Sequence, residues 1–146
     1  MDRKDFIKTC SYTCLGSLAF GSILSGCITT HAVPAKLEGN NLVVPLIHFA
    51  HKSKKGTTYK NYVVVNNEQL KYPICVFRQS DGQYIALLMQ CTHQGTELQA
   101  FGDRLQCPAH GSEFDREGQV TQGPADTALR QFPVTLENQQ LLINLK

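Results

Sequence analysis

Two short motifs decide the fold of this chain: residues 91–95 read CTHQG, and residues 107–112 read CPAHGS. Each motif offers one thiol and one imidazole, separated by one residue in the first motif and by two in the second. Such close spacing places the Cys and the His of each motif on one tight loop. Each loop can then present both side chains to a single small metal centre.

The segment between the motifs has the pattern of a β-hairpin. Residues 98–101 and 104–107 flank Gly102-Asp103, which places Gly at the first central position of a two-residue turn. A hairpin brings the ends of its two strands side by side. The two motifs are therefore expected to meet in space although they lie apart in the sequence.

Four side chains follow as candidate metal ligands: Cys91, His93, Cys107 and His110. Two Cys and two His in this order suggest an iron-sulfur centre, and hence the transfer of single electrons. Zinc is the alternative, because it also binds Cys and His. Zinc fingers usually space their ligands by about two to four residues, so the single residue between Cys91 and His93 favours the iron-sulfur centre.

The pattern C-x-H, a hairpin, then C-P-x-H-G-S-x-F-D resembles that of Rieske 2Fe-2S proteins, over roughly residues 42–146. In that family two Cys hold one iron and two His hold the other. The resemblance therefore implies one 2Fe-2S cluster. Its inner iron would be bound by Cys91 and Cys107, and its outer, reducible iron by His93 and His110.

A third element resembles the same family. Residues 123–125 read GPA, as in the proline loop that covers the cluster in Rieske proteins. The resemblance implies that Gly95, Ser112 and Pro124 surround the cluster without binding iron. Three elements in the right order make the likeness specific.

Three positions differ from the Rieske proteins of respiratory quinol-oxidising complexes. In those proteins two further Cys join the cluster loops by a disulfide, and this chain has Thr96 and Ala109 there. A Leu next to the first His of those proteins docks at the quinone site, and this chain has Gln94. The resemblance therefore implies a protein that lacks the disulfide and is less suited to oxidising quinol directly.

The hydroxyl groups around the expected cluster bear on its reduction potential. Donors to the cluster sulfurs stabilise the more negative reduced state and raise the potential. Ser112 matches the hydroxyl donor of the family, but the Tyr of high-potential members is Phe114 in this chain, which has no O–H. The midpoint is expected below the top of the Rieske range, which spans about −150 to +300 mV.

The N-terminus has the pattern of an export signal. Arg3, Lys4 and Lys8 precede an apolar run rich in small residues from about Leu15 to Leu24. Residues 24–27 then read LSGC, which resembles a bacterial lipobox. This predicts a signal peptide at 1–26 and a lipid on Cys27 that anchors the protein to a membrane, facing the periplasm or cell exterior.

Two questions about this leader stay open. An uncleaved membrane anchor is the alternative to a lipoprotein, although the apolar stretch at 12–28 is shorter than the ~20 residues that a spanning helix needs. Residues 3–8 resemble a relaxed twin-arginine signal with Lys in place of the second Arg. Export through the Sec route is the alternative.

Removal of residues 1–26 leaves 120 residues with a formal charge of +1, which suits one domain. A charge so close to zero argues against nucleic acid as a partner. Residues 27–38 are expected to be the lipidated N-terminus and its tether, and residues 39–146 the Rieske domain. Cys75 lies in an apolar run and is expected to be a buried, inert thiol.

The mature chain has the apolar periodicity of strands. Candidate strands, besides the hairpin, are residues 42–47, 62–65, 74–78, 83–89, 129–136 and 140–145. The expected fold is all-β: a Rieske-like antiparallel sandwich or barrel with a small cluster-binding subdomain built on the hairpin. Residues 52–55 are expected to form a solvated loop, and His48 and His51 to be surface residues.

The sequence shows no catalytic constellation, since the only close Cys and His residues are the expected ligands. Two functions that need no catalytic site are consistent with these features. The first is a membrane-tethered carrier of single electrons between a donor and an acceptor protein. The second is the electron-transfer subunit of a larger oxidoreductase or quinol-oxidising complex.

Overall fold

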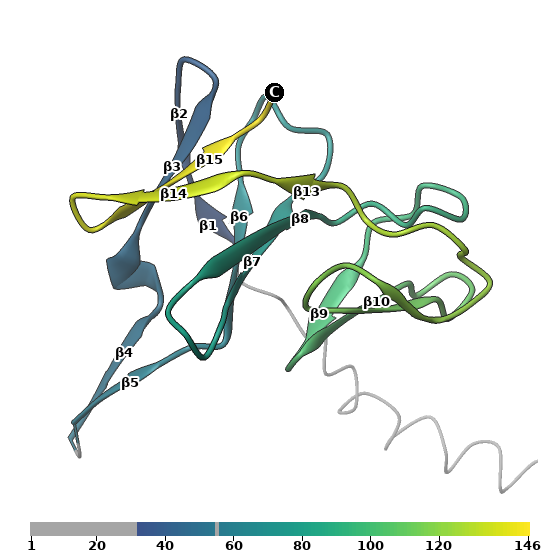
Figure 1. Ribbon diagram of the computed structural model, residues 1–146, viewed down its shortest axis with the longest axis horizontal. Coiled ribbons are helices and arrows are strands. Elements are labelled where there is room, and N and C mark those ends of the chain that lie inside the picture. The colour runs from purple at the N-terminus through teal and green to yellow at the C-terminus, as the bar shows by residue number, and fades with distance from the viewer. Residues whose placement is uncertain (1–31, 55) are drawn as a thin grey trace, which may run out of the picture.

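A computed structural model describes residues 32–54 and 56–146 of the protein. The predicted signal peptide, Cys27 and the first part of the expected tether lie outside these residues. The described chain consists of strands and one short 3-10 helix, η1, at Leu46–His48 (Figure 1). None of its helices is long and apolar enough to cross a membrane.

The central sheet has five strands in the order β1-β6-β7-β8-β13. Strand β1 runs parallel to β6, and every other pair in this sheet is antiparallel. The bounds of its strands are Val33–Pro34 for β1, Tyr62–Asn66 for β6, Ile74–Arg78 for β7, Tyr84–Leu88 for β8 and Gln131–Phe132 for β13.

Two further sheets of four strands flank the central one. The outer sheet has the order β14-β15-β3-β2, and the cluster sheet has the order β12-β11-β10-β9. A separate hairpin pairs β4 with β5 and extends from the body of the molecule (Figure 1). The bounds are β2 Lys36–Glu38, β3 Asn41–Pro45, β4 Ala50–Ser53, β5 Gly56–Tyr59, β9 Gln99–Phe101, β10 Arg104–Gln106, β11 Glu113–Asp115, β12 Val120–Gln122, β14 Val134–Glu137 and β15 Gln140–Asn144.

The central sheet is buried on both faces. Successive side chains of a strand point to opposite faces of the sheet. Cys75 and Phe77 of β7 therefore share one face, where they pack in a hydrophobic core cluster with residues of the sheet β12-β11-β10-β9. Ile74 and Val76 pack in a second cluster with the outer sheet. A strand covered on both faces has a continuous apolar run instead of an alternating one, which explains the sequence of β7.

The structure confirms the all-β fold and most of the expected strands, including β7 with its predicted ends. Pro133 separates β13 from β14 within the single strand expected at 129–136, because proline has no N–H for a strand ladder. Residues 52 and 53, expected in a loop, belong to β4. His51 is exposed as expected, whereas His48 is half-buried in η1.

Part of the segment expected to be a tether forms strands instead. Strand β1 pairs with β6, and β2 pairs with β3. Between them, the Ala35 N–H donates to the Asn66 carbonyl at 2.9 Å, and Asn67 Nδ2 donates to the Ala35 carbonyl at 2.8 Å. Because these backbone groups bond to the domain, the fold begins by Val33 and not at residue 39.

Replacement of Gly118 by Ala is expected to destabilise the cluster sheet. Gly118 lies in the turn before β12 at φ +79°, and a Cβ there would lie 2.9 Å from Leu87 Cδ2 in the core. Gly82 is a matched control, because it has φ +82° but open space around its Cβ position. Gly118→Ala should lower the free energy of unfolding by about 1–3 kcal/mol more than Gly82→Ala, measured by urea denaturation. Equal losses would mean that Leu87 moves aside freely.

Candidate metal centre

The first motif forms a loop closed by its own backbone. The Gly95 N–H donates to the Cys91 carbonyl at 2.8 Å, and the Cys91 N–H donates to the Thr96 carbonyl at 2.8 Å. Gly95 has φ +74°, a backbone conformation that residues other than glycine rarely adopt. Glycine therefore permits the chain to fold back within five residues.

The second motif repeats this arrangement. The Gly111 N–H donates to the Cys107 carbonyl at 3.0 Å, and the Cys107 N–H donates to the Ser112 carbonyl at 2.8 Å. Gly111 has φ +77°. In both loops the Gly N–H thus donates to the Cys carbonyl, and the Cys N–H donates to the carbonyl of the residue after the Gly. The His residues stand at different positions in the two loops.

The predicted hairpin joins the two loops. Phe101 pairs with Arg104 across Gly102-Asp103, and Gly102 has φ +58°, which confirms the two-residue turn. Strand β11 adds to the other side of β10. These pairings hold the two loops together at one end of the cluster sheet.

The four candidate ligands lie at two depths. Cys91 and Cys107 are each 2% exposed and are free thiols, whereas His93 and His110 are exposed. The two imidazole rings lie 5.1 Å apart between centroids, with their planes at 87°. The structure therefore brings the thiols together in the interior and the imidazoles together at the surface. Among the described residues, no three His, Cys, Asp or Glu side chains are grouped to hold a single metal ion.

The surroundings of Cys107 favour its thiolate. Burial raises the pKa of Cys107, but hydrogen bonds from the backbone of His110 and Ala109, and from the side chains of Cys91 and Thr96, outweigh burial and lower it. The thiolate is the form that binds a metal. Thr96 takes the place of one of the two Cys that form the disulfide in quinol-oxidising Rieske proteins, and its side chain thus contributes to this site.

Cys75 provides a contrast in the same hydrophobic cluster. It is fully buried, and burial raises the pKa of its thiol far above the ordinary value. No hydrogen bond offsets this effect. The predicted burial of Cys75 is confirmed. Its environment raises the pKa of the thiol, whereas the environment of Cys107 lowers it.

Ser112 connects the second loop with the proline loop. It is fully buried, and its Oγ accepts a hydrogen bond from the Ala125 N–H at 3.0 Å. Because the oxygen accepts this bond, the O–H proton is left to be donated to another acceptor. Pro124, expected beside the cluster, is exposed, and Phe114 is fully buried under the second loop.

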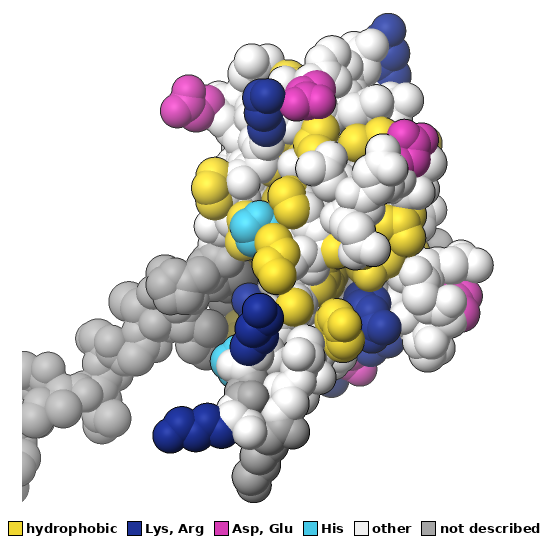
Figure 2. Space-filling model, turned by 90° about the vertical axis from the view of Figure 1, so that its left-hand side faces the viewer, with side chains coloured by type: hydrophobic (Ala, Val, Ile, Leu, Met, Phe, Trp, Pro, Cys, Tyr) yellow, Lys and Arg dark blue, Asp and Glu magenta, His cyan; other side chains and the backbone are white. Residues whose placement is uncertain are grey.

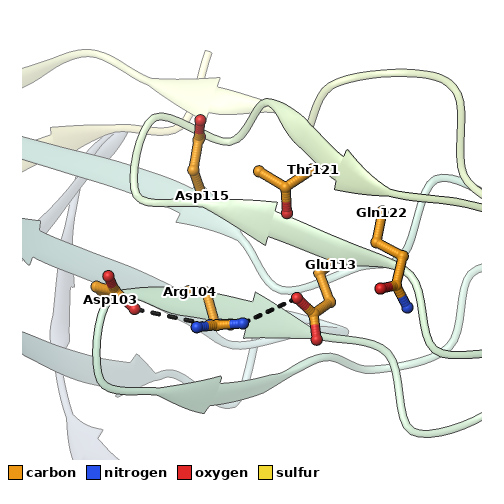
Figure 3. A pocket seen from close by; sticks show the side chains of 6 residues that line it. All are labelled: Asp103, Arg104, Glu113, Asp115, Thr121 and Gln122. Carbon is orange, nitrogen blue, oxygen red and sulfur yellow. Dashed lines mark hydrogen bonds and ion pairs between the residues drawn. The ribbon is translucent and has the colours of Figure 1, made fainter.

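Two side chains outside the motifs hold the two glycine carbonyls. The Tyr72 hydroxyl donates to the Gly95 carbonyl at 2.7 Å, and Gln122 Nε2 donates to the Gly111 carbonyl at 2.9 Å. Figure 3 shows Gln122 on β12, at the edge of the cluster sheet. Neither residue was predicted from the sequence, because no local pattern links Tyr72 to a loop more than twenty positions away.

The solvent face of the cluster sheet is polar. Arg104 on β10 pairs with Glu113 on β11 at 3.0 Å and with Asp103 in the hairpin turn at 3.7 Å (Figure 3). The opposite face carries Leu105 and Phe114, which pack on the central sheet. Polar and apolar side chains thus alternate along β10 and β11, and this alternation decides which face of the sheet is buried. Because a shift of one residue would turn the apolar side chains to solvent, the alternation also sets the register between these strands and so aligns the two loops.

Replacement of Tyr72 by Phe is expected to loosen the first loop. It removes only the hydroxyl that bonds to Gly95, so the free energy of unfolding should fall by about 1 kcal/mol, measured by urea denaturation. Tyr84→Phe is the matched control, because Tyr84 is also half-buried, and it packs edge-on against Phe49 in the other hydrophobic cluster. An equal loss in both variants would contradict a specific role for the bond to Gly95.

Comparison with known families and proteins locates the similarity in this part of the chain. Residues 49–133 match the Rieske 2Fe-2S domain. The chain is 39% identical over 75 residues to the oxygenase component of dicamba O-demethylase from Stenotrophomonas maltophilia, covering 44% of this chain and 22% of that protein. It is 36% identical over 56 residues to the cytochrome b6-f complex iron-sulfur subunit of Prochlorococcus marinus, covering 37% of this chain and 32% of the subunit.

A solved structure has the same fold. The cyanobacterial plasma membrane Rieske protein PetC3 from Synechocystis PCC 6803 superposes with a TM-score of 0.52 at 28% identity, covering 57% of this chain and 86% of that one. By contrast, the matches to the two curated relatives span only about a fifth to a third of their lengths.

Proposed function

This chain belongs to the Rieske 2Fe-2S family, and from that premise we propose that it is a membrane-tethered carrier of single electrons. The chain contains a Rieske-type electron-transfer domain, and the family carries one 2Fe-2S cluster, so zinc is no longer the alternative. The cluster supplies one-electron chemistry when bound. The residues of this chain hold it, shield it and present it to partners.

In this proposal Cys91 and Cys107 bind one iron, and His93 and His110 bind the other. The observation that supports it is the difference in depth: the thiols are buried and the imidazoles are exposed at the surface. The buried thiols would hold the cluster from the interior, and the exposed imidazoles would hold it on the side that a partner can approach. Thiolate stabilisation at Cys107 and the unused O–H of Ser112 suit the same group.

Low-temperature EPR of the dithionite-reduced protein tests the proposal directly. A rhombic signal with the low average g value of His-ligated 2Fe-2S centres is expected. An EPR-silent protein that contains zinc would contradict it. Metal analysis of the same sample gives the iron content independently of the signal.

The membrane attachment in this proposal depends on Cys27, which lies outside the described residues. It is supported by the LSGC sequence at residues 24–27 and by the likeness to a Rieske protein of a plasma membrane. The protein would then face the periplasm or the cell exterior. The intact mass of the protein purified from membranes tests this: a chain that begins at residue 27 with an added diacylglycerol is expected, and an unmodified residue 1 would contradict it.

A second candidate function is the electron-transfer subunit of a larger complex. The likeness to a cytochrome b6-f subunit favours it, whereas Gln94, Thr96 and Ala109 distinguish this chain from quinol-oxidising members. Purification from solubilised membranes separates the two candidates. A partner in fixed stoichiometry supports the subunit, and a lone protein that exchanges electrons with soluble partners supports the carrier.

A further inference from the structure

A groove lies at the end of the molecule that carries the β4–β5 hairpin. It has a volume of about 450 Å³ and lies between η1, the hairpin and the turn from β14 to β15. Apolar residues of η1 and the hairpin line one side, the amides of residues 138–140 line the other, and no residue of the lining is charged. Ile47 and Tyr59 border it and are 62% and 58% exposed, which is unusual for large hydrophobic side chains in this protein. Figure 2 shows this face, with hydrophobic side chains gathered at its middle and Lys or Arg side chains below them.

The hairpin beside this groove is basic. Between Glu38 and Glu68 the sequence has four Lys and no acidic residue. Ala50 pairs with Tyr59, so Lys52, two residues from Ala50, lies on the same face of the hairpin as Tyr59. The side chains of Lys52, Lys54 and Lys60 are exposed.

An arginine from the central sheet adds to this charge. The Arg78 guanidinium lies over the Tyr59 ring, 4.9 Å from its centroid, and brings a positive group from β7 to the groove. Two acidic residues stand close in sequence to this surface: Glu137 at the end of β14, next to the groove, and Asp81 in the turn after β7. We call the surface formed by Ile47, Lys52, Lys54, Tyr59 and Lys60 the basic end.

We propose that the basic end docks on a membrane surface that contains anionic lipid headgroups. Exposed apolar and aromatic side chains next to a cluster of Lys are the combination that binds at such an interface: the apolar groups enter the headgroup region, and the Lys side chains attract the phosphates. A soluble acidic protein would match the positive charge of this surface but would not explain why the apolar side chain of Ile47 is exposed there. The complementary charge and the exposed side chains of Ile47 and Tyr59 therefore favour the bilayer.

This inference rests on the proposed lipid at Cys27. Only six peptide units separate Cys27 from Val33, where β1 begins, and fully extended they reach about 20 Å. A tether so short holds the domain against the bilayer and gives one of its surfaces the opportunity to dock. The basic end has the chemistry for that contact.

Docking at the basic end orients the electron-transfer site. Figure 1 places the cluster sheet, which carries the two loops, and the β4–β5 hairpin at opposite ends of the molecule. With the basic end on the bilayer, His93 and His110 face away from the membrane. The electron partner is then a protein that approaches from the aqueous phase and not a quinol in the bilayer.

Tryptophan fluorescence tests this orientation, because the chain contains no Trp. Ile47→Trp places a single reporter in the basic end, and Glu117→Trp, in the exposed turn between β11 and β12, is the control. Each full-length protein is purified from membranes and reconstituted into vesicles of phosphatidylcholine, with or without phosphatidylglycerol, in which the acyl chains carry bromine. Quenching and a blue shift are expected for Ile47→Trp on the anionic vesicles only, and for Glu117→Trp on neither.

Charge reversal identifies the Lys residues as the cause. Lys52→Glu, Lys54→Glu and Lys60→Glu together should lower the docking equilibrium by at least about tenfold and abolish the quenching. Reversal of the exposed Lys36, Lys71 and Lys146 makes the same change in net charge and should leave the quenching in place.

Three results would overturn the inference. The first is no quenching of Ile47→Trp on anionic vesicles, and the second is equal quenching of Glu117→Trp. The third is a blue shift of Ile47→Trp without vesicles that grows with protein concentration, because it would assign the surface to contact with a second copy of the chain. The EPR signal and the intact mass are measured on the same samples. A failure of docking is therefore distinguished from loss of the cluster and from absence of the lipid.

Discussion

Replacement of Cys107 by Ala is expected to yield a folded protein with little or no bound iron and no rhombic EPR signal. The side chain is 2% exposed and is the thiol whose thiolate the surrounding hydrogen bonds stabilise. Without it, three proposed ligands remain, and the all-sulfur iron loses one of its two protein bonds. Iron analysis and EPR of the purified variant measure the loss.

Cys75→Ala is the matched control for this experiment. Cys75 is fully buried in the same hydrophobic cluster and is also a free thiol, so both variants remove a sulfur from the same part of the core. The control should retain its full iron content and EPR signal. Loss of iron in both variants would show that core packing, and not ligation by Cys107, retains the cluster.

Replacement of Ser112 by Ala is expected to lower the midpoint potential by about 65–130 mV. Its O–H is the buried donor left free when its oxygen accepts the Ala125 N–H. Hydrogen bonds to charged groups contribute about 1.5–3 kcal/mol, and for a one-electron couple about 1.4 kcal/mol corresponds to 59 mV. Because the donor stabilises the more negative reduced state, its removal makes reduction harder and lowers the potential.

The same replacement has a second effect that is measured separately. It leaves the Ala125 N–H without its acceptor, so the free energy of unfolding should fall by about 1–3 kcal/mol. Thr121→Val is the matched control, because it also removes a hydroxyl from the cluster sheet but at an exposed position on the solvent face (Figure 3). Redox titration should show an unchanged midpoint for Thr121→Val, and an unchanged midpoint for Ser112→Ala would contradict the role of its O–H.

Local sequence patterns predicted the features that depend on residues close together in the chain. The turn at Gly102-Asp103 is such a case, because a two-residue turn selects its own residues. The apolar run of β7 is another, since burial on both faces requires it. The close Cys and His spacings of the two motifs are of the same kind.

Short strands were harder to predict than long ones. Strands β11 and β12 have three residues each, too few for a periodic pattern. The β4–β5 hairpin is polar and exposed, so no hydrophobic alternation marks it. Such strands form because a neighbouring strand supplies hydrogen bonds, and that neighbour is not evident from the strand itself.

Residue types at short spacing were enough to predict the family, the all-β architecture and the candidate ligands. The packed fold was needed to show that the thiols lie inside and the imidazoles outside, and that Tyr72 and Gln122 hold the loop glycines. It was also needed to show the hydrogen bond from Ala125 to Ser112. It also placed the basic end opposite the cluster loops. The physical reason is that burial and long-range hydrogen bonds arise only when distant segments pack together, so no local pattern contains them.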